Sequence, residues 1–103
     1  MNFVGRTKSI PDRLLGEAEK AVNLYKEAIR VRPTDFQARL LMAQIYDDLG
    51  QADEARASRQ KGIEMAEQHL ALHPDDVRAM YMAANGMAAL NNHRLKAVGL
   101  LGD

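Results

Sequence analysis

Two histidines four residues apart are the best candidates for metal ligands in this sequence. His69 and His73, in the stretch HLALH, would share one face of a helix, which is the spacing of a two-ligand zinc site. A zinc hydrolase of the HExxH type needs Glu directly after the first His, but Leu70 stands there. A structural metal would need two further ligands. We therefore expect no metal, and we place His73 in the last turn of a helix, near the negative end of the helix dipole.

Paired carboxylates are the second candidate for chemistry, in Asp47–Asp48 and Asp75–Asp76. Neighbouring residues of a helix point about 100° apart, so the first pair does not converge. The second pair stands where a helix would begin and is explained as a cap. No Ser/His/Asp arrangement, phosphate loop or nucleotide fingerprint is present, and the chain has no Cys. We therefore expect no enzymatic activity and no cofactor.

The composition indicates one all-α domain. The 103 residues are 47% hydrophobic but only 5% aromatic, and they are rich in the helix formers Ala, Leu, Met, Glu, Arg and Gln. The 14 basic and 14 acidic residues balance, so no basic surface suggests a nucleic acid or an anionic membrane as a partner. No apolar run approaches the ~18 residues of a transmembrane helix, and no signal sequence is evident. We expect a cytoplasmic protein.

Hydrophobic periodicity and helix-boundary residues predict four helices separated by short connections. Thr34 and Gln37 fit a capping box at the N-terminus of the second helix, and Gly50 suits the end of that helix. Asp75 or Asp76 should cap the fourth helix, which Asn91–Asn92 should break. Residues 1–10 are expected to be poorly ordered. The helices are expected over about 11–31, 35–49, 53–73 and 76–90, with a weak helical tail. Connections of two to four residues force successive helices into antiparallel hairpins.

Expected packing positions follow from the same periodicity. The fourth helix should carry Val77, Met80, Ala84 and Met87 on its inner face. The helical methionines are expected mostly in the core, where Met fills irregular gaps. Arg59 should pair with Asp47 or Asp48. Gly62 and Gly86 cost stability inside helices, so we expect close helix approach at both.

Self-alignment reveals a repeat with two different spacings. A shift of 34 places Gly16 on Gly50, Ala21 on Ala55, Ala28 on Gly62, Ile29 on Ile63 and Val31 on Met65. A shift of 41 places Pro33 on Pro74, Asp35 on Asp76, Ala38 on Ala79, Ala43 on Ala84 and Leu49 on Leu90. The difference of seven residues is nearly two helical turns, which leaves the buried face on the same side. The extra residues therefore lie within 53–73, and that helix should overhang its neighbours by about 10 Å.

A 34-residue helix-turn-helix unit with small residues at fixed places and a terminal Pro resembles the tetratricopeptide repeat. Counted from Phe36, the matching positions are Ala43, Tyr46, Gly50 and Ala55, and the resemblance covers residues 14–92. It departs at Arg39, Met80, Arg59 and Met87. The resemblance implies antiparallel αα-hairpins stacked as a short right-handed solenoid. The expected units are a half repeat over 11–33, an elongated repeat over 34–74 and a partial repeat over 75–103.

The resemblance also implies a function: non-catalytic binding of a protein partner. In this family the first helices of the repeats line a concave groove that takes an extended peptide or a helix. The corresponding residues are Gln37, Leu40, Gln44, Asp47, Arg78, Tyr81 and Asn85. Arg and Asn could hold a carboxylate or a peptide backbone, and Leu and Tyr an apolar side chain. The alternative is that some of these side chains only pack or face water.

A second hypothesis is structural. About three repeats are normally needed for a stable stack, and this chain shows fewer. Apolar surface should therefore stay exposed at the terminal helices, where it would drive self-association into a homo-oligomer. The two hypotheses predict different surfaces, the groove in one case and the end helices in the other.

Overall fold

A computed structural model describes residues 10–100, and within that range the chain forms four α-helices. They are α1 (Asp12–Val31), α2 (Phe36–Asp48), α3 (Ala52–Leu72) and α4 (Val77–Ala97). The predicted all-α, helical-repeat class is confirmed. The expected poorly ordered segment 1–10 falls, apart from Ile10, outside the described residues, as do residues 101–103 of the partial repeat.

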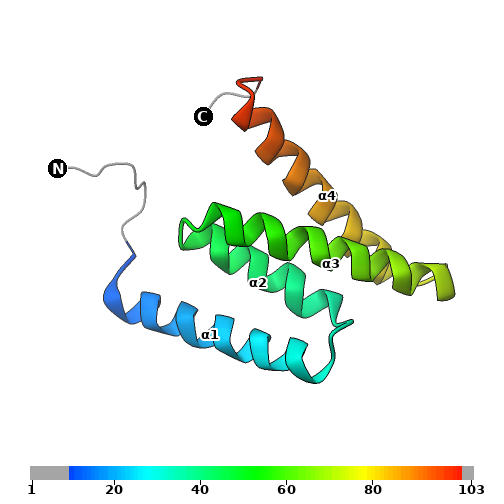
Figure 1. The fold of residues 1–103 in the computed structure, drawn as a ribbon, viewed down its shortest axis with the longest axis horizontal. Helices are drawn as coiled ribbons and strands as arrows, with labels where there is room; N and C mark the ends of the chain where they lie inside the picture. The colour runs from blue at the N-terminus through cyan, green and yellow to red at the C-terminus, as the bar shows by residue number, and fades with distance from the viewer. Residues whose placement is uncertain (1–9, 101–103) are drawn as a thin grey trace.

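The helices stack in chain order (Figure 1). α2 lies between α1 and α3, and α4 packs against α3 and, more sparingly, α2. Within residues 10–100, α1 has no other helical neighbour than α2. No helix in this range combines the length and hydropathy needed to cross a lipid bilayer.

Aspartate side chains cap the N-termini of α2 and α4. The Asp35 carboxylate accepts a hydrogen bond from the Ala38 amide at 3.0 Å, and Asp76 accepts one from Ala79 at 3.1 Å. The Asp76 cap was predicted. The capping box at Thr34 was wrong, because the helix begins one residue later and the Asp35 side chain satisfies the free amide there. α1 begins after Pro11, which makes no side-chain capping hydrogen bond.

Glycines in the left-handed conformation close two helices. Gly50, at φ +76°, follows α2 as predicted, and the Gln51 amide donates to the Tyr46 carbonyl at 2.8 Å. Gly99, at φ +81°, ends α4 in the same way. The predicted break at Asn91–Asn92 was wrong, since α4 runs on to Ala97. Asn costs a helix less than about 1 kcal/mol, so the flanking helix formers prevail.

The interior is built from small residues that let helices approach closely. Ala43, Ala66 and Ala79 are fully buried. A Cβ atom added at Gly62 would lie 2.8 Å from the Leu40 side chain, which confirms the predicted close approach of α3 to α2. At Gly86 it would lie 3.0 Å from Ile63, so the predicted close approach of α4 to α3 is confirmed as well.

The predicted inner face of α4 was wrong. α4 turns Ala79, Ala83 and Gly86 inward, while Val77, Met80, Ala84 and Met87 face solvent. The reason is geometric: α4 packs against α3 and α2 through one face, and within residues 10–100 no helix covers its opposite face. Met42 and Met65 are buried as expected, but Met80 and Met87 are not.

The elongated α3 continues past the N-terminal end of α2, as the repeat spacing predicts (Figure 1). Near this end, the ring of Phe36, the first residue of α2, lies 5.3 Å from that of His69. His69 Nε2 lies 2.7 Å from Asp76 Oδ2, and the His69 and His73 rings stack at 4.7 Å. The end of α3 therefore meets the starts of both α2 and α4. His69 makes the contacts to both, and His73 stacks on His69.

Candidate functional site

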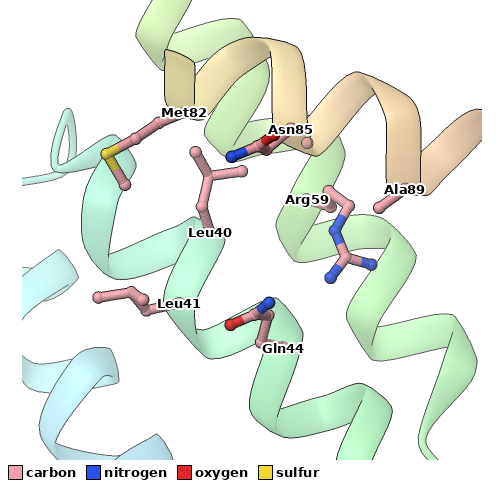
Figure 2. Close-up of a pocket in the computed structure, with 8 residues that line it drawn as sticks. Leu40, Leu41, Gln44, Arg59, Met82, Asn85 and Ala89 are labelled. Atoms are coloured by element: carbon pink, nitrogen blue, oxygen red, sulfur yellow. The ribbon is translucent and has the colours of Figure 1, made fainter. Parts of the chain in front are cut away.

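A pocket of about 170 Å³ opens where α2, α3 and α4 meet (Figure 2). α2 contributes one wall and α4 the other, and α3 supplies the floor. The lining residues are Leu40, Leu41, Gln44, Arg59, Met82, Asn85, Gly86 and Ala89. The groove is defined here as this set of eight. The walls lie close together because Gly86 has no side chain. A Cβ atom there would crowd the side chains of Ile63 and Leu40.

Arg59 is the charged group in the floor of the groove. Its side chain is buried, and its Nη2 lies 2.9 Å from Asp47 Oδ2, which confirms the predicted pairing. The carboxylate compensates the guanidinium, which would otherwise be costly to bury. The pair joins α3 to α2 and leaves Arg59 little free charge for a ligand carboxylate.

The predicted groove residues divide into two groups. Leu40, Gln44 and Asn85 line the groove together, and Asp47 holds Arg59 from beside it. The other three do not line it: Gln37 is half-buried on α2, and Arg78 and Tyr81 are exposed on α4.

Five lining residues were not among the predicted groove residues: Leu41, Arg59, Met82, Gly86 and Ala89. Arg59 was detectable, because a charged residue on the inward stripe of a helix indicates a partner or a polar site. Leu41, Met82 and Ala89 carry no such signal. Their place follows from how α4 crosses the hairpin of α2 and α3.

The groove is suited to holding a polypeptide. Gln44 and Asn85 present exposed amides on opposite walls, and each amide both donates and accepts hydrogen bonds, as a peptide backbone requires. Leu40, Leu41 and Met82 add apolar surface for a side chain. The eight lining residues include no Ser, Cys, His or carboxylate, so the groove holds no nucleophile with an adjacent base.

Comparison with known proteins points to one family. Residues 13–58 match the family model described as tetratricopeptide repeat. This segment comprises nearly all of α1, the whole of α2 and the first part of α3. Searches of curated proteins and of solved structures give no significant match. Together with the repeat pattern and the four stacked helices, the match supports a tetratricopeptide repeat assignment for residues 13–58.

Proposed function

We propose that the protein is a non-catalytic interaction module that holds an extended segment of a partner protein in the groove between α2 and α4. Tetratricopeptide repeats generally mediate protein–protein interactions. The observation that carries the proposal is that the exposed Gln44 and Asn85 amides line one pocket together with the apolar side chains of Leu40, Leu41 and Met82. We assign the half repeat to 11–33, the elongated repeat to 34–74 and the partial repeat to 75–103.

The ligand chemistry follows from the electrostatics of the groove. Because Asp47 compensates Arg59, the groove favours backbone amides and one medium-sized apolar side chain over an acidic terminus. Arg78, exposed on α4 outside the groove, offers a further contact for a carboxylate that follows the bound segment. The expected partner is therefore an extended, largely uncharged peptide.

Selection from a phage-displayed library of random peptides, followed by calorimetric titration of the selected peptides, tests the proposal. Gln44→Ala combined with Asn85→Ala should weaken binding at least about tenfold, the effect of losing roughly 1.4 kcal/mol. Both residues are exposed, so helicity should be unchanged. The matched control is Gln60→Ala with Gln68→Ala, two exposed amides of α3 outside the groove. Equal weakening by both pairs would reject the groove as the binding site.

The second candidate function, self-association through the terminal helices, is supported by a separate observation. α4 exposes a continuous apolar face that lies outside the groove.

A further inference from the structure

α4 carries an apolar face that no helix covers within residues 10–100. Its members recur at helical spacing, so they lie side by side on one stripe. The α4 face is defined as Val77, Met80, Tyr81, Ala84, Met87 and Ala88, all of them exposed. Its large side chains range from 43% exposed at Met87 to 71% at Val77. The face contains no charged residue, and none of its members lines the groove.

α2 shows what these positions do when a helix covers them. The shift of 41 residues places Leu40 on Tyr81, Ala43 on Ala84 and Tyr46 on Met87. Leu40, Ala43 and Tyr46 are all buried. Tyr46 packs in one cluster with Ala55 of α3. The α2–α3 hairpin is thus an internal template for a helix bound to the α4 face.

α1 has the matching open face on its other side. The shift of 34 residues extends to place Leu24 on Ser58, Ala28 on Gly62 and Val31 on Met65. The three α3 residues are buried, but Leu24 and Val31 are 72% and 70% exposed. The α1 face is defined as Ala21, Leu24, Ala28 and Val31.

The contacts of α3 show how the α1 face would be used. Ser58 Oγ donates a hydrogen bond to the Arg39 carbonyl of α2 at 2.7 Å, and Gly62 lies against Leu40. Ser58 and Gly62 therefore face α2 directly. Their counterparts on α1, Leu24 and Ala28, occupy the same positions of a helix whose partner is not present in the described chain.

We propose that α1 of a second copy of this chain docks on the α4 face of the first, and forms in trans the hairpin that α2 and α3 form within one chain. In this register Leu24 meets Met80, Ala28 meets Tyr81 and Ala21 meets Met87. Each contact is apolar on both sides, which favours a second copy over a charged partner. Methionine at two of the positions accommodates the small differences from the α2–α3 packing.

The proposed contact is heterologous, because two different surfaces meet. Each copy that joins brings its own open α4 face, so the assembly grows with concentration beyond a pair. The groove residues Gln44 and Asn85 take no part, so the two binding events are independent and their tests are separate.

Sedimentation equilibrium over about 1 µM to 1 mM, the range in which weak complexes form, tests the proposal. The mass of the natural chain should rise above that of one 11.5 kDa chain as the concentration increases. Leu24→Glu and Met87→Glu should each stay at one chain, because each has lost one of the two surfaces. An equimolar mixture of the two should form a pair and stop there, because each supplies the face that the other lacks.

Leu72→Glu is the matched control. Leu72 is 79% exposed and belongs to neither face, so this variant should associate like the natural chain. Far-ultraviolet circular dichroism checks that all variants stay helical, and Val31→Glu replaces Leu24→Glu if that variant loses helicity.

Three results would overturn the proposal. The first is a natural chain that keeps the mass of one chain throughout. The second is association of Leu24→Glu by itself, which would indicate a like-with-like contact of two α4 faces. The third is a mixture of the two variants that fails to pair although both are helical.

Discussion

The α2–α3 hairpin and the outer faces of α1 and α4 share one repeat pattern but differ in exposure, although Ala21 and Ala28 of the α1 face are half-buried. Ala43 is fully buried whereas its counterpart Ala84 is exposed, and Tyr46 is buried whereas Met87 is 43% exposed. The pattern fixes which side of a helix carries small and apolar residues. Whether that side is buried depends on a neighbouring helix. The repeat pattern therefore determines the position of the apolar side, and the stacking of helices determines whether that side is buried.

The two regions also differ in chemistry. The hairpin buries polar groups with their partners: Ser58 bonds the Arg39 carbonyl, and Arg59 pairs with Asp47. Across the described residues, no buried side-chain nitrogen or oxygen lacks a partner. The open faces contain only apolar residues. Polar partners make the hairpin specific for one arrangement, because any other would leave them unsatisfied.

Truncation of Tyr46, the aromatic core residue of the α2–α3 hairpin, should lower stability far more than truncation at the matching position of the α4 face. Tyr46→Ala should lower the free energy of unfolding by about 3 kcal/mol, since it leaves a cavity beside Val22 and Ala55. Met87→Ala, at the matching position of α4, should change it by less than about 1 kcal/mol. Urea denaturation at low protein concentration measures both. Similar losses would mean that the α4 face is covered within a single chain.

Removing the carboxylate that compensates Arg59 should have the next largest effect. Asp47→Ala leaves a guanidinium whose side chain is 7% exposed without its ion pair, so the expected loss is about 2 kcal/mol. Asp47 itself is 41% exposed, and water replaces part of what it supplied, which keeps the loss below that of a fully buried pair.

Asp53→Ala is the control for this prediction. Its partner Arg56 is 44% exposed and Asp53 is 87% exposed, so the loss should stay below about 1 kcal/mol. Chemical denaturation of both variants under one set of conditions gives the comparison. A loss at Asp47 no larger than that at Asp53 would show that Arg59 reaches water without its partner.

These differences also explain which features the sequence predicts. The cost of glycine inside a helix predicted the close approaches at Gly62 and Gly86, and the suitability of glycine for a helix end predicted Gly50. The two repeat spacings predicted the long α3. Each of these features depends on local geometry or on helical phase. The groove wall formed by Met82 and Ala89 depends on how α4 crosses α3, which no local pattern contains. The inner face of α4 was predicted from a stripe that is apolar but uncovered. Hydrophobic periodicity alone cannot tell a buried face from one that awaits a partner.

Replacing a glycine by alanine should change the stability in opposite directions in the closely packed hairpin and in the open helix α1. Gly62→Ala should lower stability by about 1 kcal/mol, since the new Cβ would lie 2.8 Å from Leu40 and 3.3 Å from the Arg39 Cβ atom. The helix preference for Ala offsets only part of that cost. Gly16→Ala, in α1, meets nothing within 4 Å and should raise stability by up to about 1 kcal/mol. Thermal unfolding of both variants gives the two signs, and a gain at both would argue against close packing of α2 on α3.

The junction at the end of α3 should show the smallest effect, as a dependence on pH. The hydrogen bond from His69, together with those from the Ala79 and Arg78 amides, lowers the pKa of Asp76 below its ordinary value of 3.8. A carboxyl whose pKa is lower in the folded than in the unfolded chain stabilises the fold above the ordinary value, and this contribution disappears as pH falls through the folded pKa.

Asp76→Asn keeps a residue able to cap α4 but removes the charge that His69 meets. The melting temperature of the natural chain should therefore exceed that of the variant near pH 6, and the difference should shrink as pH falls below 3.8. In a His69→Gln background the pH-dependent difference should be smaller but not zero, because the backbone amides still favour the carboxylate. A difference that His69→Gln leaves unchanged would assign the pKa of Asp76 to its capping bonds alone, and the histidine at the end of the elongated helix would then serve only to pack against Phe36.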